Sequence, residues 1–226
     1  MGEYYNWINI EKKEYICPAL FGYGSKYWET AHKDSIPTHA MYDLLSGRWK
    51  EDHILWFDDE CPISIESPYG IIRELYRQTV EYGEPGIPFD MICETYRNIS
   101  GLFVEAEKRV REEIGNSVED QKNGTGFYEY NEFGIDIGNP YEGLFTERIH
   151  RYKYTINHTK NIAYSIGKTK IYYQSGKEID FADPITNLLG FGRVEEPGAW
   201  IGDIVGVADD LPEGYSLLEK VVLNWG

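Results

Sequence analysis

The chain has 226 residues, of which 42% are hydrophobic and 27% charged. It is long enough to bury a core as one large domain or two small ones, and this composition excludes a disordered chain or a collagen-like repeat. The formal net charge of −16, from 22 basic and 38 acidic residues, disfavours nucleic acid and anionic membrane surfaces as partners and favours cationic ones.

Targeting signals and cysteine pairs are also missing from the sequence. No apolar run reaches the ~20 residues that a membrane-spanning helix needs, and the first residues lack the basic and apolar regions of a signal peptide. The three cysteines, Cys17, Cys61 and Cys93, form no CxxC pair. We therefore expect a cytoplasmic protein whose cysteines are reduced thiols in the core.

Aromatic residues make up 15% of the chain, with 19 tyrosines and 6 tryptophans. Such an excess is typical of β-rich packing, and it is also found at protein interfaces. We interpret the excess as aromatic-rich sheets and core, with a binding surface as the alternative.

The first sixty residues predict a hairpin, a short helix and a strand. Polar and apolar residues alternate on both sides of a polar turn over residues 4–17, which indicates a β-hairpin. Thr38 can cap a short helix that ends at Gly47. The apolar run from His53 to Phe57 predicts a buried strand that leaves the core through acidic residues.

The middle of the chain predicts two helices. Ser67 and Pro68 mark the start of the first, which ends at Gly83. The second is predicted to run from Asp90 to Gly115, because apolar residues recur along it at alternating steps of four and three. We expect a polar loop over residues 116–126.

The last third of the chain resembles the first. At an offset of 151 residues, Trp49 matches Trp200, Asp52 matches Asp203, and Asp58 and Asp59 match Asp209 and Asp210. Ile8-Asn9 followed by Lys12 and Tyr15 also resembles Ile156-Asn157 followed by Lys160 and Tyr164, with one residue inserted before the tyrosine.

These matches predict an α+β fold in one compact domain. Two similar hairpin-helix-strand segments, residues 1–61 (the N-terminal segment) and 151–226 (the C-terminal segment), would flank a helical insert at 62–150. An internal duplication would explain the similarity. Coincidence is the alternative, because Leu44-Leu45 fall on Glu195-Glu196 at the same offset.

The pattern Ile8-Asn9-x-x-Lys12-x-x-Tyr15, followed by Trp49-x-x-Asp52, resembles a group of bacterial proteins with no known activity. The second copy, with Asn157-His158-Thr159-Lys160 and Gly202-Asp203, is similar to the same group. In the first copy Glu51 stands where the glycine is expected. The resemblance implies a bacterial origin and brings no site residues.

Catalytic and metal-binding motifs are absent. His32 and His39 lie seven residues apart across Pro37, without an HExxH or Cys/His pattern, so we predict no metal site. No GxSxG elbow or glycine-rich phosphate loop is present, so no cofactor is predicted and no catalytic residue is assigned. Cys17-Pro18 and Cys61-Pro62 adjoin apolar segments, which disfavours a catalytic thiol.

The acidic ends of the two predicted strands are the best candidate site. They could hold a hard cation or supply a general base, although aspartate is also common where a strand turns into solvent. The leading hypothesis is an acidic module that binds a basic protein, such as an immunity or antitoxin-like inhibitor of a toxic nuclease. The predicted contact residues are Glu51, Asp58, Asp59, Glu60, Asp209, Asp210 and Glu213.

Two other functions stay open at this stage. The chain could be a small hydrolase or metal-dependent enzyme that uses Asp58 and Asp59 or Asp209 and Asp210. It could also be a structural or phage-related accessory protein.

Overall fold

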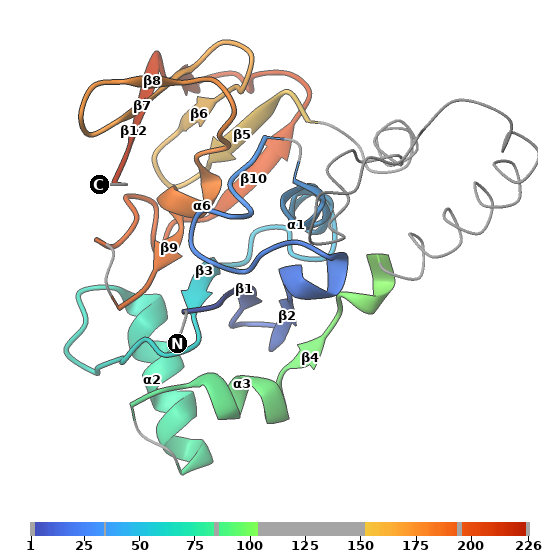
Figure 1. Cartoon of the computed structure of the whole chain (residues 1–226), viewed down its shortest axis with the longest axis vertical. Coiled ribbons are helices and arrows are strands. Elements are labelled where there is room, and N and C mark those ends of the chain that lie inside the picture. Colours follow the sequence, from blue (N-terminus) through green and yellow to red (C-terminus); the bar gives the residue numbers. More distant parts are fainter. Residues whose placement is uncertain (1–2, 34, 84–85, 104–151, 194–195, 225–226) are drawn as a thin grey trace, which may run out of the picture. The chain divides into compact units, whose positions relative to one another are not determined.

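The structure, a computed structural model, describes residues 3–33, 35–83, 86–103, 152–193 and 196–224 (Figure 1). The chain forms two compact parts, Met1–Ser100 with Tyr152–Gly226, and Gly101–Arg151. The helices below belong to the first part and are η1 (Pro18–Phe21), α1 (Ile36–Ser46), α2 (Gly70–Tyr82), α3 (Phe89–Thr95) and α6 (Ile185–Leu188). Together with three sheets they make the fold α+β, as the sequence predicts.

The strands, all in the same part, are β1 (Tyr5–Asn9), β2 (Glu14–Ile16), β3 (Ile54–Asp58), β4 (Arg97–Asn98), β5 (Tyr154–Asn157), β6 (Ile162–Tyr164), β7 (Lys170–Tyr173), β8 (Glu178–Ile179), β9 (Gly190–Phe191), β10 (Val205–Ala208), β11 (Ser216–Leu217) and β12 (Lys220–Leu223). β12 pairs parallel with β7, and β8 pairs antiparallel with β7, in a small third sheet. No helix in the described part of the chain is long and apolar enough to cross a bilayer.

The first sheet has the strand order β4-β2-β1-β3-β9. β1 and β2 form the predicted hairpin, and β3 pairs antiparallel with the other side of β1. β4 and β9 are parallel edge strands next to β2 and β3. β4 lies inside the predicted helical insert, so that insert also contributes a strand to the first sheet.

The second sheet repeats four strands of the first. Its order is β10-β5-β6-β11, in which β5 and β6 form a hairpin, β10 is antiparallel to β5 and β11 is parallel to β6. The order and directions therefore match those of β3-β1-β2-β4. The register matches as well, because Glu14 of β2 faces Arg97 and Ile162 of β6 faces Ser216.

The two hairpins share their loop geometry. Four residues separate the strands in each, and each loop ends on a residue with positive φ, Lys13 at 51° and Asn161 at 52°. Because the loops have equal length, Tyr164 corresponds to Ile16. The predicted match of Tyr164 with Tyr15 through an inserted residue is therefore wrong.

The turns before β3 and β10 also correspond. Trp49 and Trp200 are both buried, and each donates its backbone N–H to a leucine carbonyl, that of Leu44 at 2.6 Å or of Leu188 at 2.8 Å. Their rings differ in surroundings, since Trp49 donates its indole N–H to Glu14 and Trp200 packs on Tyr164. These similarities agree with an internal duplication, which stays a prediction.

The N-terminal and C-terminal segments exchange contacts. α1 of the N-terminal segment packs against β10 of the C-terminal segment. In return, β9 of the C-terminal segment pairs with β3, and the backbone N–H of Trp56 donates to Leu189 at 3.0 Å. An isolated bridge between His32 and Ala182 adds a third link. Neither segment therefore buries its apolar surfaces without the other.

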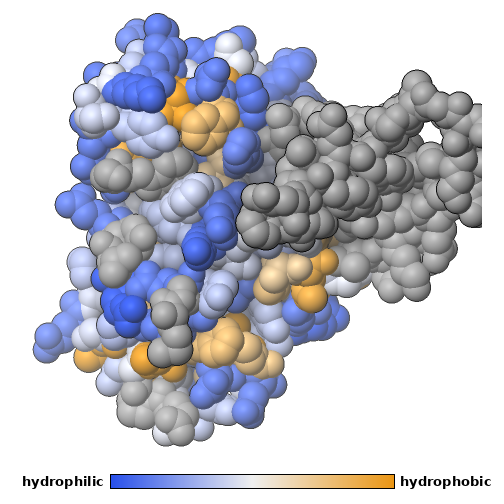
Figure 2. Space-filling model, in the orientation of Figure 1, coloured by the Kyte–Doolittle hydropathy of each residue, from blue (hydrophilic) through white to orange (hydrophobic). Residues whose placement is uncertain are grey.

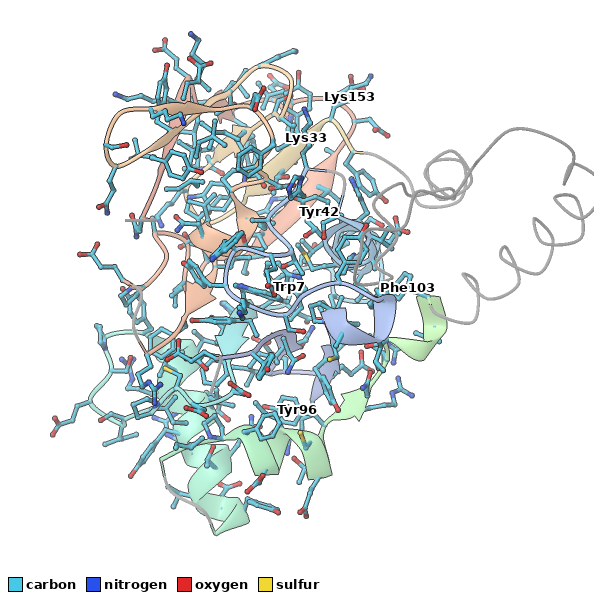
Figure 3. All side chains as sticks on the ribbon, in the orientation of Figure 1. Trp7, Lys33, Tyr42, Tyr96, Phe103 and Lys153 are labelled. Atoms are coloured by element: carbon cyan, nitrogen blue, oxygen red, sulfur yellow. The ribbon has the colours of Figure 1, made fainter. Side chains whose placement is uncertain are left out.

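Aromatic rings fill the core of the first sheet (Figure 3). Trp7 and Trp56 are completely buried and lie 4.9 Å apart between ring centroids, and Tyr5 stacks on Trp56 at 5.5 Å. α2 and α3 cover the same sheet through Ile72 and Met91. Fewer than half of the described aromatic residues are fully buried, and Trp28 is 61% exposed.

A buried carboxylate joins α1 to the second sheet. Asp183 accepts hydrogen bonds from the hydroxyls of Tyr42 of α1 at 2.6 Å and Tyr164 of β6 at 2.5 Å, and from the backbone N–H of Ile185 at 3.0 Å. Burial and the adjacent carboxylate raise the pKa of both tyrosines well above the usual range, so both hydroxyls stay protonated and donate. Thr155 donates to Tyr42 and completes the network.

The predicted helices are confirmed in two cases and wrong in one. α1 ends before Gly47, and α2 ends before Gly83, whose φ of 107° suits glycine. Thr38, the predicted cap of α1, lies inside the helix because Ser35 takes the N-cap position.

The continuous helix predicted from Asp90 to Gly115 is broken. α3 ends at Thr95, where Tyr96 becomes extended and leads into β4. The pairing of β4 with β2 therefore overrides the helical pattern. Residues 104–115, the predicted loop at 116–126 and most of the predicted insert lie outside the described residues.

We expect Glu51→Gly to raise the free energy of unfolding by about 1 kcal/mol, since a side chain is disfavoured at positive φ and glycine is not. Glu51 has a φ of 64°, and Gly202, at the matching position of the C-terminal segment, has a φ of 81°. Urea denaturation measures the change. Glu51→Ala, which removes the charge but keeps the strain, should give no such gain, and equal stabilisation by both variants would contradict the backbone explanation.

We expect Tyr164→Phe to lower the free energy of unfolding by about 1–3 kcal/mol, because it removes a donor from a buried acceptor. Tyr172→Phe is the matched control, since that hydroxyl makes only a 3.4 Å contact with Glu178 at the surface. It should change stability by less than about 0.5 kcal/mol. Equal effects of the two substitutions in urea denaturation would show that the Asp183 network does not stabilise the fold.

Candidate functional site

The repeated sequence motif forms a cluster of three side chains in the N-terminal segment. Asn9, at the end of β1, is completely buried. Its side-chain oxygen accepts the backbone N–H of Lys12 at 2.9 Å, and its amide nitrogen donates to Asp52 at 2.8 Å. The ammonium of Lys12 pairs with the same Asp52 oxygen. The cluster fixes the hairpin loop and ties it to the turn before β3.

The C-terminal segment contains the same cluster. Asn157 accepts the N–H of Lys160 at 2.9 Å and donates to Asp203 at 2.7 Å, and Lys160 pairs with Asp203 at 2.5 Å. Every member of the motif is therefore used to hold a hairpin to a turn, which is a structural role. Asp52 and Asp203 therefore stabilise the turns before β3 and β10.

The acidic residues around β3 lie at its two ends. Glu51 is exposed and precedes the strand. Asp58 is completely buried at the other end, where its oxygens accept the backbone N–H groups of Glu60 at 2.9 Å and Arg193 at 3.0 Å. Burial is the main cause of its raised pKa. Asp58 therefore closes a turn and is buried within the molecule.

The two neighbours of Asp58 are already engaged. Asp59 accepts the backbone N–H of Tyr4 at 2.9 Å, and Glu60 pairs with Arg193 at 3.2 Å. Both are half-buried. This end of β3 is closed by contacts within the molecule.

The acidic residues after β10 are more accessible. Asp209, Asp210 and Glu213 are all exposed. They surround Leu211 and Tyr215, which pack partly buried against Tyr154, Ile156 and Ala163. We call residues 209–215 the acidic segment. The structure thus separates the predicted contact residues into two groups. Asp58, Asp59 and Glu60 are closed by internal contacts, whereas Glu51 before β3 and the three acidic residues after β10 are exposed.

Thiol and imidazole groups are dispersed. Cys61 is buried, but Cys17 is half-buried and Cys93 exposed, so the prediction of three core thiols is wrong for Cys93. His32 packs on Phe181, and His39 contacts the carbonyl of Lys33. Within the ranges that the structure describes, no three His, Cys, Asp or Glu side chains gather as a metal site.

A cavity of about 540 Å³ lies beside the Asn9 cluster. Its lining combines the β1–β2 loop, the residue before β3, one face of α2 and the turn before β10. Those residues are Ile10, Glu11, Lys13, His53, Gly70, Ile71, Glu74, Gln78 and Gly202. Neither pair of strand-end aspartates is among them.

A histidine and a glutamate face each other in this cavity. His53 Nδ1 lies 2.5 Å from Glu11 Oε1, and the backbone N–H of His53 donates to the other oxygen at 3.2 Å. The hydrogen bond that the Glu11 carboxylate accepts from the imidazole raises the pKa of His53. This effect outweighs burial, which lowers the pKa. The charges of Glu11, Asp52 and Asp203 raise it further. The imidazolium is therefore favoured in this site.

A second carboxylate enters from α2. Glu74 accepts from Arg77 at 3.1 Å and from Gln78 at 3.3 Å, while Gln78 accepts the hydroxyl of Tyr96 at 2.8 Å. Burial is the first cause of the raised pKa of Tyr96, and the charges of Glu74 and Glu11 add to it. Glu11 and Glu74 therefore both act electrostatically on the hydroxyl of Tyr96.

This arrangement suits recognition of a charged group better than nucleophilic catalysis. A carboxylate that orients an imidazole is a common acid–base pair, but among the residues that the structure describes no Ser, Thr or Cys lines the cavity. Sequence reasoning missed the site. Glu11, His53 and Glu74 are 42 and 21 residues apart and share no motif, so no sequence signal joins them.

We expect Glu11→Gln to lower the pKa of His53, measured by NMR titration of the imidazole protons. Because the folded-state pKa lies above the unfolded value, the pair stabilises the fold below pH ~6.5, and this stabilisation is lost as pH rises through the folded-state pKa. The stability difference between wild type and variant should shrink over the same range. The titration of His158, which contacts Tyr215 instead, is the internal control, and an unshifted His53 would contradict the assignment.

Comparison of the chain with protein-family models, with curated proteins and with solved structures finds no match. Function is therefore inferred from the charge and geometry of the molecule itself.

Proposed function

We propose that this protein binds a basic protein partner and occludes it, in the manner of an immunity or antitoxin-like inhibitor of a toxin such as a nuclease. A net charge of −16 attracts a cationic surface over long distances and accelerates the encounter. Such an inhibitor needs no catalytic apparatus.

The accessible acidic segment is the observation that carries this proposal. The stretch from Val205 to Glu219 contains four acidic residues and no basic one. Asp210 and Glu213 make no hydrogen bond or ion pair with any described residue. Their carboxylates are therefore available to lysine and arginine side chains of a partner.

The fold holds the acidic segment in place. The hydroxyl of Tyr215 bonds with His158 Nδ1 at 2.8 Å, and the backbone N–H of Tyr215 donates to Pro212 at 3.2 Å. Gly214, with a φ of 83°, allows the tight turn between them. A segment that is ordered before binding loses less conformational entropy in a complex.

Polar residues also dominate the coloured surface of one face of the molecule. Figure 2 shows hydrophilic residues over most of the part of that face that is not grey, with separate hydrophobic patches between them. Association through such a surface depends on charge, with Leu211 and Tyr215 supplying apolar contact area at the acidic segment.

We expect the neighbouring reading frame to encode a basic protein. The proposal is tested by co-expressing the chain with that product, and by measuring growth rescue and complex formation. We expect wild type to rescue growth and Asp209→Lys/Asp210→Lys to slow association roughly tenfold or more. Association of the wild type should also slow sharply toward ~1 M salt, where the Debye length is about 3 Å.

Glu81→Lys/Glu94→Lys is the matched control, because both residues are exposed and lie on α2 and α3. It makes the same change in net charge at a different place. Equal slowing by the two double variants would mean that net charge alone matters and would remove the acidic segment as the interface. Failure of wild type to rescue growth or to co-purify would reject the inhibitor function for that partner.

A further inference from the structure

The cavity beside His53 has the lining that a basic side chain requires. We propose that it binds the guanidinium or ammonium group of an arginine or lysine side chain of the protein partner, with Glu74 and Glu11 as the recognising carboxylates. This inference rests on the proposed function. It adds a second binding site for the partner, formed by residues outside the acidic segment.

The size and shape of the lining suit such a side chain. A volume of about 540 Å³ is within the range of sites for small ligands. Ile71, Glu74 and Gln78 follow one another at helical spacing on one face of α2, so an apolar contact lies next to two polar ones. Arginine and lysine side chains match this lining, because each has an apolar stem and a charged end group.

The two carboxylates are accessible to a ligand. The side chains of Glu11 and Glu74 are 43% and 49% exposed. Each already has one cationic neighbour, His53 or Arg77, but a carboxylate accepts several hydrogen bonds. A guanidinium can donate two parallel hydrogen bonds to one carboxylate, which favours arginine in this place.

The charge of the cavity depends on His53. With His53 neutral, the lining residues Glu11, Glu74 and Lys13 give a net charge of −1, and protonation of His53 makes it zero. The charges of Asp52 and Asp203 also raise the pKa of His53. Each of these carboxylates is paired with a lysine, Lys12 or Lys160. A cationic ligand should therefore bind more tightly as pH rises and His53 loses its proton.

The test is an NMR titration of the full-length ¹⁵N-labelled chain with Nα-acetyl-arginine amide. We expect saturable shifts at the amides of His53, Gly70, Glu74 and Gly202, with affinity increasing between pH 6 and pH 8. Glu74→Gln should weaken binding roughly five- to tenfold, as expected for loss of one partly exposed charged hydrogen bond. Arg77→Gln should tighten binding, because it frees Glu74 from its ion pair.

Glu81→Gln is the control variant, since Glu81 lies on α2 but does not line the cavity. It should leave the affinity unchanged. Nα-acetyl-glutamine amide and Nα-acetyl-glutamate amide are the ligand controls. Shifts of equal size with either of them, or no saturable shift with the arginine compound, would overturn the proposal.

Two further comparisons distinguish a free amino acid from a partner's side chain as the ligand, and the cavity proposal from the proposed function. Free arginine that binds more than tenfold tighter than the blocked compound would identify a free amino acid as the ligand and overturn the partner side chain. Arginine binding without capture of the basic neighbour would keep the cavity site and reject that partner. Capture of the neighbour that is unaffected by Glu74→Gln, without arginine binding, would reject the cavity site and keep the proposed function.

Discussion

The buried carboxylate of Asp183 is the interaction on which the arrangement of the two segments depends. A carboxylate removed from water is costly unless its oxygens accept hydrogen bonds, and Asp183 receives them from Tyr42, Tyr164 and the backbone of Ile185. Tyr42 belongs to α1 of the N-terminal segment, whereas the other donors belong to the C-terminal segment. Separation of α1 from the second sheet would break the hydrogen bond between Tyr42 and Asp183.

The exchange of contacts between the segments follows from this constraint. α1 lies against β10, and the chain after α6 returns to add β9 to the edge of the first sheet (Figure 1). Each segment thereby completes the hydrophobic packing of the other. The region between Asp52 and Asp203 lies where the two segments meet, since both carboxylates act on His53.

Two clusters built from the same motif shape that region. Asn9 and Asn157 each fix a hairpin loop and hold the aspartate that precedes the next strand. Next to the first cluster in the chain, Glu11, Lys13 and His53 line the cavity. The turn of the second cluster contributes Gly202, and α2 completes the lining. A motif whose own residues are structural therefore places other residues that are free to bind a ligand.

The sequence by itself determined the local elements. Alternating polarity specified the first hairpin, and turn residues ended α1 and α2. The spacing of Trp49 and Asp52 recurs at Trp200 and Asp203, and the two turns that contain these residues have corresponding backbone hydrogen bonds. Composition also fixed the acidic character of the chain. These properties depend on neighbouring residues or on simple sums over the sequence.

Only the tertiary structure decided which residues meet. The pattern from Asp90 onward is helical, yet β4 interrupts it because the edge of β2 offers backbone hydrogen-bond partners. Asp58 and Asp209 match in sequence, but Arg193 and Glu60 close over the first, while the second stays exposed. The pairing of β1 with β3 brings Glu11 to His53, and the packing of α2 against the first sheet adds Glu74. Contacts between residues so far apart leave no local pattern in the sequence.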